Sequence, residues 1–143
     1  MNLFEDIREF HEKFRLNYDG KPRRLPTDLQ EFRSHFIAEE ANEYLQAITE
    51  MSNQVLHGED ITEQLELALD SLVDLVYVVL GTAYLHGFDF NEAWRRVHAA
   101  NMRKVRAVNA EDSKRNSTHD VIKPEGWVPP SHTDLVMDHE DSV

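Results

Sequence analysis

The segment of residues 63–85, EQLELALDSLVDLVYVVLGTAYL, constrains the fold of this chain more than any other feature. It is apolar on nearly every side, and a helix that is hydrophobic all round is a buried helix. At about 100° per residue its acidic side chains fall within a quarter turn of one another, namely Glu63, Glu66, Asp70 and Asp74. Burying several ionised carboxylates together is unfavourable unless they are protonated or a cation compensates their charge. This line of acids therefore predicts either shared protons or a bound metal.

The composition excludes several classes of protein. The chain has 143 residues, the size of one domain, and its lack of cysteine excludes disulfides, thiolate zinc sites and a cysteine nucleophile. A formal net charge of −12 argues against nonspecific binding to nucleic acid or anionic membranes, which needs clustered lysine and arginine. Asp74 interrupts the longest apolar run, and the N-terminus MNLFEDIREFHEKF carries acids where a signal peptide needs positive charge. We therefore expect a cytoplasmic protein that binds neither nucleic acid nor a membrane.

The hydrophobic periodicity predicts an all-α fold. Four helices are expected over residues 3–16, 27–56, 63–85 and 90–108. Gly87 is expected to end the third helix, and polar residues can cap the N-termini, at Asn2, Thr27, Asp60 and Asp89. From Ala110 the periodicity stops, so residues 110–130 are predicted to form a tail that is ordered by itself or by a ligand. Residues 1–130 are thus expected to be one domain that includes this tail, with residues 131–143 an acidic, disordered terminus.

The second expected helix turns acidic on its apolar face. Glu40 and Glu43 project from the middle of the stripe of leucine and phenylalanine, and Glu39 stands at its edge. Asp70 and Asp74 share one side of the third helix, because residues four apart are neighbours on a helix surface. If the two helices pack antiparallel, these four inward carboxylates converge on one cavity. Hard oxygen ligands favour Mg²⁺, with Mn²⁺ as a substitute, and the chain has no Glu-x-x-His, the motif of di-iron bundles.

Positive side chains occur away from the acidic face. Lys104 is expected on the fourth helix, and Lys114, Arg115 and Lys123 lie in the tail. Magnesium commonly completes its coordination shell with substrate phosphate. Carboxylates, a metal and a few cations together suggest hydrolysis of a phosphoanhydride by metal-activated water.

Four motifs, in this order, resemble those of one superfamily. They are EEANE at 39–43, DSLVDLVYVVLGTA at 70–83, HAANMRK at 98–104 and KPEGWVPP at 123–130. They look like the MazG-like, all-α NTP pyrophosphatase superfamily, in its single-domain branch with dUTPase-like and phosphoribosyl-ATP-pyrophosphohydrolase-like members. The resemblance implies a four- to five-helix bundle assembled as a homodimer or dimer of dimers. It also implies Mg²⁺-dependent cleavage of a nucleoside triphosphate to the monophosphate and pyrophosphate.

The resemblance assigns roles residue by residue. Its E-E-x-x-E motif makes Glu40 and Glu43 metal ligands, and gives Glu39 the role of water activator or further ligand. The second motif, E-x-x-D, matches at Asp74 but has Ser71 in place of the glutamate, so Asp70 is assigned the missing ligand role by inference.

The remaining assignments concern the substrate. Asn101 and Lys104 match an Asn-x-x-Lys that contacts sugar and phosphate. The segment from Lys123 to Trp127 resembles a tail that closes over the nucleotide, and Lys114 and Arg115 are further candidates for phosphate binding. Which base is bound is not encoded in a visible motif.

Two other functions fit the acidic helices. One is a noncatalytic dimerisation or regulatory module whose carboxylates pair with arginine or lysine across a subunit interface. The other is a carboxylate-bridged redox metal bundle.

Overall fold

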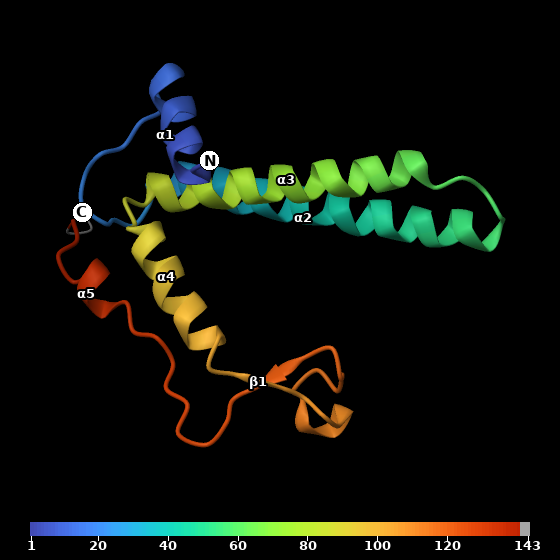
Figure 1. The fold of residues 1–143 in the computed structure, drawn as a ribbon. Coiled ribbons are helices and arrows are strands. Elements are labelled where there is room, and N and C mark those ends of the chain that lie inside the picture. The colour runs from blue at the N-terminus through green and yellow to red at the C-terminus, as the bar shows by residue number, and fades with distance from the viewer. Residues whose placement is uncertain (141–143) are drawn as a thin grey trace. The chain divides into compact units, whose positions relative to one another are not determined.

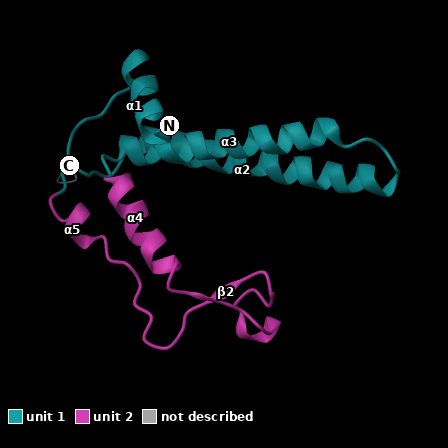
Figure 2. Cartoon of the chain, viewed as in Figure 1, with its two compact units in different colours: residues 1–88, 139–143 teal, residues 89–138 magenta. Residues whose placement is uncertain are grey.

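The computed structural model describes residues 1–140 and is mostly helical (Figure 1). Within this range it has five α-helices and a two-stranded antiparallel ladder, which confirms the all-α class. The elements in chain order are α1 (Leu3–Lys13), α2 (Thr27–Leu56), α3 (Thr62–Leu85), α4 (Phe90–Asn101), β1 (Val105–Arg106), the 3-10 turn η1 (Ala110–Asp112), β2 (Val121–Ile122) and α5 (Thr133–Val136). Two compact units divide the chain (Figure 2): residues 1–88 with the segment from His139, and residues 89–138.

The first unit is built on a helical hairpin. α2 and α3 run antiparallel side by side, joined by residues 57–61, and α1 packs against α3 (Figure 1). Small residues let the two long helices approach closely, because Ala47 of α2 and Ala68 of α3 are buried. Larger apolar side chains fill the end of the hairpin near α1, among them Ile7, Val78, Leu80, Tyr84 and Leu85.

A buried arginine ties α2 to α3. The Nε of Arg33 donates a hydrogen bond to Oγ1 of Thr82 at 3.0 Å, and its Nη2 donates to the carbonyl oxygen of Val78 at 2.8 Å. Gly81 lies against the guanidinium, where a Cβ would stand 2.6 Å from Nη2 of Arg33. A side chain at position 81 would therefore have to displace the guanidinium of Arg33.

The predicted helices are confirmed, but several of their ends are not where the sequence placed them. Asn2 caps α1 and Asp89 caps α4 through their side chains, as predicted, and Gly87 ends α3 at a φ of 73°. The first helix ends at Lys13 rather than Leu16, because Arg15 adopts a left-handed φ of 58°.

Two predicted N-caps and one predicted helix end were wrong, although α2 begins at Thr27 as expected. Pro26, not Thr27, is the N-cap of α2, and Ile61, not Asp60, is that of α3; within residues 1–140 neither of these caps makes a side-chain hydrogen bond. The fourth helix ends at Asn101 rather than Val108, because Val105 and Arg106 pair with β2 instead of continuing the helix.

The second unit holds α4, the short ladder and α5. Arg96 of α4 reaches Asp134 of α5 at 2.6 Å and also pairs with Glu92 one turn earlier. The predicted tail of residues 110–130 contains η1 and β2, and the indole Nε1 of Trp127 donates to the carbonyl of Ala100 at 2.7 Å. The domain boundary at 130 and the disorder of residues 131–143 stay predictions; residues 133–136 form α5, and residues 141–143 lie outside the described part.

The apolar surface of α3 is only partly covered within the chain. Side chains at intervals of three and four fall on one exposed face of this helix, namely Leu65, Leu69, Leu72 and Val76. By length and composition alone α3 could cross a membrane, with a mean hydropathy of 1.5 over its most apolar window, but the core helix of a globular protein passes the same test. That the protein avoids membranes, and that it is a homo-oligomer in the cytoplasm, stay predictions.

Candidate metal centre

Three carboxylates of α2 meet in the structure. Glu39, Glu40 and Glu43 each offer an oxygen, and these atoms all lie within 4.8 Å of one another. The cause is helical spacing, since residues three and four apart lie on the same side of a helix. Glu40 is buried, whereas Glu39 and Glu43 are exposed. The cluster therefore has one oxygen-bearing group inside the protein and two at its surface.

Glu40 is the member of this cluster whose carboxylate charge is least favourable. Only 8% of the residue is exposed, and among the described residues no group donates a hydrogen bond to its buried Oε2. Burial raises the pKa of this carboxyl, and the nearby charges of Glu43, Asp74 and Glu39 raise it further. A buried carboxylate among other carboxylates needs a proton or a cation.

Asp74 of α3 acts on this cluster through its charge, although it is not one of the three carboxylates that meet within 4.8 Å. This residue is half-buried, and its charge acts on Glu40 across the interface of the two helices. Asp70 is not among the groups that shift the pKa of Glu40; it is exposed and lines a separate hollow with Glu63 and Glu66. Of the predicted line of acids, Asp74 alone is half-buried and acts on Glu40, whereas Glu63, Glu66 and Asp70 are exposed.

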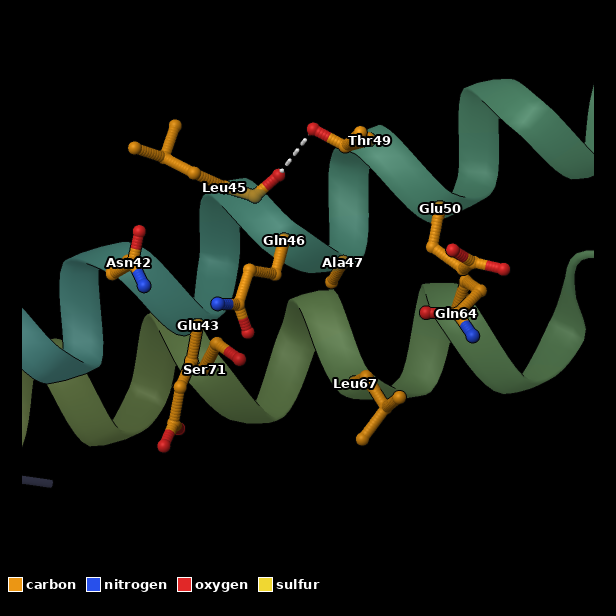
Figure 3. Close-up of a pocket in the computed structure, with 10 residues that line it drawn as sticks. All are labelled: Asn42, Glu43, Leu45, Gln46, Ala47, Thr49, Glu50, Gln64, Leu67 and Ser71. Carbon is orange, nitrogen blue, oxygen red and sulfur yellow. Dashed lines mark hydrogen bonds between the residues drawn. The ribbon is translucent and has the colours of Figure 1, made fainter.

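Ser71 stands where the resemblance expects a glutamate. It is buried and lines a hollow between α2 and α3 together with Glu43 (Figure 3). We call this the amide hollow, of about 680 Å³, because polar side chains that include three amides surround it. Its other lining residues are Asn42, Leu45, Gln46, Ala47, Thr49, Glu50, Gln64 and Leu67.

A second hollow lies on the other side of the carboxylates. Phe32, His35, Phe36 and Glu39 line it, and its volume is about 260 Å³. We call it the aromatic hollow. No sequence motif marks this hollow, although Phe32 and Phe36 precede Glu40 by eight and four residues and so continue its side of α2.

The predicted substrate-binding residues all belong to the second unit. Within that unit two lysines lie near Trp127, with Nζ of Lys104 at 5.2 Å and Nζ of Lys123 at 5.0 Å from a ring centroid of the indole. Asn101 is the last residue of α4 and is exposed. Trp127 and the two lysines thus form a cationic, partly aromatic surface.

The other two candidates of the second unit are placed differently. Lys114 is exposed. Arg115 pairs with Asp120, at 3.1 Å between Nη1 and Oδ2. The hydrogen bond from Ser113 lowers the pKa of Asp120 most, and the backbone N–H of Val121 and the pair with Arg115 lower it further. The role of each in binding a substrate stays a prediction.

A comparison with known families matches the chain over residues 7–101 to the family of phosphoribosyl-ATP pyrophosphohydrolase. No curated protein gives a significant match. The matched residues include the three α2 carboxylates, Asp74 and Asn101, whereas Lys104 and Trp127 lie beyond them. Since the match covers well over half of the sequence, the chain belongs to the phosphoribosyl-ATP pyrophosphohydrolase family, whose members are nucleotide pyrophosphohydrolases of the MazG-like all-α superfamily.

Proposed function

We propose that the protein is a Mg²⁺-dependent nucleoside triphosphate pyrophosphohydrolase that cleaves an NTP or dNTP to the monophosphate and pyrophosphate. The observation that carries this proposal is the buried, unpartnered Oε2 of Glu40 within a cluster of carboxylates, in a chain of a pyrophosphohydrolase family. A buried oxygen without a hydrogen bond is unfavourable, and a bound cation would satisfy it.

The donor set fits a hard divalent ion. The groups available are carboxylate oxygens, which suit Mg²⁺ and Mn²⁺ better than softer metals. Glu40 and Glu43 with Asp74 would hold the ion, and Glu39 is near enough to be a further ligand. When bound, Mg²⁺ supplies a water of lowered pKa and neutralises charge on the leaving pyrophosphate. Asp70 as a ligand stays a prediction, because it is exposed and lines another hollow.

Side chains of the protein can accept the proton of the attacking water and bind the substrate. Glu39 is exposed at the edge of the cluster, so its carboxylate can take the proton of the attacking water and release it to solvent. The water oxygen then forms a bond to the α-phosphorus while the bond from that phosphorus to the bridging oxygen breaks, and the pyrophosphate leaves with the electron pair. Lys104 and Lys123 carry charges suited to the phosphates, and Trp127 offers a ring; we propose these, with Asn101, as substrate ligands.

A panel of substrates tests the reaction. Canonical and modified NTPs and dNTPs, with phosphoribosyl-ATP, are incubated with Mg²⁺ or with EDTA, and released pyrophosphate is measured. At least one substrate should give pyrophosphate and monophosphate in equal amounts with Mg²⁺ and none with EDTA. Hydrolysis of no substrate, with a melting temperature indifferent to Mg²⁺, would favour the noncatalytic dimerisation module. Bound iron and a visible absorption band would favour the redox bundle.

Variants of the cluster test the site. Glu43→Gln and Asp74→Asn keep the shape of the side chain but remove its charge, and turnover should fall roughly 100-fold or more, since even outer-shell partners of a metal site cost 10- to 100-fold. Mg²⁺ should raise the melting temperature of the wild type, by mass action, and should raise it less in both variants. Glu31→Gln, an exposed position on the same helix, is the matched control and should behave as wild type. Full activity in both cluster variants would rule out the site.

A further inference from the structure

The aromatic hollow presents rings beside the carboxylate cluster. Phe32 is 58% exposed, although it lies on the side of α2 that leads to Glu40. Its ring centroid lies 5.6 Å from that of Phe36, at 60° between the planes. Behind Phe36 the guanidinium of Arg33 lies 5.5 Å from the ring centroid, on the buried side of the helix. Phe36 is therefore near both Phe32 and the buried Arg33, and the exposed surface of Phe32 is open to a ligand.

Position along the helix links these rings to the proposed chemistry. At about 1.5 Å per residue, Phe36 lies roughly 6 Å from Glu40 along the axis of α2, and Phe32 roughly twice as far. Glu39 belongs to both features, because it lines the aromatic hollow and offers an oxygen to the carboxylate cluster. In a nucleotide, one sugar separates the α-phosphate from the base. If the α-phosphate lies at the carboxylate cluster, the base therefore reaches about as far as Phe36 lies from Glu40.

The aromatic hollow combines two rings with one carboxylate, and this combination favours a nucleotide over a protein surface. A protein surface packed on Phe32 and Phe36 would have to bury the charge of Glu39 as well, which is unfavourable without a partner. A nucleotide avoids this conflict, because its base meets the rings while its phosphates and their cation meet the carboxylate. At about 260 Å³ the hollow also suits a part of a ligand rather than a whole one.

The amide hollow is the less suitable place for a base. Glu43 and Glu50 line it, and its described lining residues include no aromatic ring. Every nucleobase has a face that can stack on a ring, and such stacking is general among proteins that bind unpaired bases.

We infer that Phe32 and Phe36 form the base-binding subsite of the nucleotide, with His35 at the rim able to hydrogen-bond an edge of the base. This inference rests on the proposed function, because it takes the phosphates to lie at the α2 carboxylates. It predicts that the rings act on the binding of the nucleoside part and leave the binding of the phosphate part unchanged.

Product binding tests the subsite. Isothermal titration with Mg²⁺ measures the affinities of dAMP, dGMP, dCMP, dTMP and dUMP, and separately that of pyrophosphate. Phe32→Ala should weaken the tightest monophosphate roughly 5- to 100-fold, the usual worth of one stacked base, and leave pyrophosphate unchanged. Phe32→Trp should restore the affinity. With a hydrolysed substrate, Phe32→Ala should raise KM more than it lowers kcat.

The control is Val55→Ala, which removes a similarly exposed apolar side chain from the same helix, 59% exposed, and should match wild type. Wild-type hydrolysis is measured independently, so failure of the proposed function is seen without any variant. The inference is overturned if Phe32→Ala binds every monophosphate as wild type does. It is also overturned if Phe32→Ala changes the sedimentation coefficient and leaves nucleotide binding unchanged, which would place another copy of the chain on the rings.

Discussion

His11 and Arg33 show how individual side chains set the conditions for this fold. His11 is 3% exposed, its Nδ1 lies 2.8 Å from the carbonyl oxygen of Ile7, and its ring packs 4.7 Å from that of Tyr84. Burial lowers the pKa of His11; the bond to Ile7 opposes this, and the charge of Arg33 adds to the lowering. The folded state therefore favours a neutral imidazole at the contact of α1 with α3.

A pH dependence follows from the lowered pKa. Below the ordinary value of 6.5 the unfolded state binds a proton that the folded state resists, so stability should fall as pH falls through and below that value. In His11→Gln this contribution disappears, and the free energy of unfolding should depend less steeply on pH than in wild type between about pH 5 and 7. Urea unfolding at a series of pH values measures both slopes.

His57 provides the matched control. Its Nδ1 makes the same kind of bond, 2.8 Å from the carbonyl oxygen of Asn53 four residues earlier, but the residue is exposed. His57→Gln should retain the wild-type slope. Equal slopes in wild type and His11→Gln would show that the buried imidazole does not carry the effect.

Among the metal-centre residues, the sequence was informative where helical periodicity decides direction. Glu40 and Glu43 interrupt an apolar stripe, so spacing alone placed them side by side, and the structure brings them together with Glu39. Only Glu40 is buried, because Glu43 lies at the edge of the interface and is exposed. Asp70 was assigned by proximity to a motif, yet the residue that faces Glu43 is Ser71. Neighbouring residues such as Asp70 and Ser71 point about 100° apart around the helix axis. Only the packing of α3 on α2 decides which of them faces inward.

Among the elements, the α2·α3 interface depends on one glycine. Alanine is favoured over glycine in a helix by about 1 kcal/mol, so Gly81→Ala would stabilise α3 in isolation. In the folded chain its Cβ would displace the guanidinium of Arg33, which is buried and makes two hydrogen bonds. Hydrogen bonds of a charged group contribute roughly 1.5–3 kcal/mol each, and that loss exceeds the gain in propensity.

A double-mutant cycle tests this balance. Gly81→Ala should destabilise the protein by roughly 1 kcal/mol or more, measured by chemical denaturation. In the background of Arg33→Met, which removes the guanidinium, the same substitution should cost less, because the gain in helix propensity is then opposed only by the 3.2 Å contact of the new Cβ with Cε1 of His11. A stabilising Gly81→Ala in the wild-type background would show that the arginine moves aside without loss.

The long helices were predictable and their ends less so, for a physical reason. α2 and α3 each repeat the helical period over many turns, so their existence followed from the sequence. Their N-termini are capped by Pro26 and Ile61, whose backbones turn the chain without the side-chain bond that a capping motif predicts. β1 and β2 have two residues each, too short for any period, and arise only when distant segments pair.

At the scale of the whole molecule, the exposed apolar face of α3 supports the predicted homo-oligomer. Leu69 is 64% exposed, and Leu65, Leu72 and Val76 share its face. A contiguous apolar stripe on a helix is favourable only when another surface covers it. Wild type is therefore expected to associate in solution.

Sedimentation velocity over a range of protein concentrations checks this expectation. Leu69→Lys places a charge in the centre of the stripe and should weaken self-association at least roughly tenfold, since a buried unpaired charge is costly. Val55→Lys, a similarly exposed apolar position on α2, is the control and should leave association unchanged. A wild-type protein that stays monomeric at all concentrations would contradict the prediction.

The acids of the centre all come from a single helical hairpin closed by residues 57–61. Closing so short a loop loses little chain entropy, and contacts that are local in sequence form early. A nascent chain can thus assemble these acids once α3 has left the ribosome, before the tail is synthesised. On the proposed function, the divalent ion bound by these acids would also hold the newly made hairpin closed during translation.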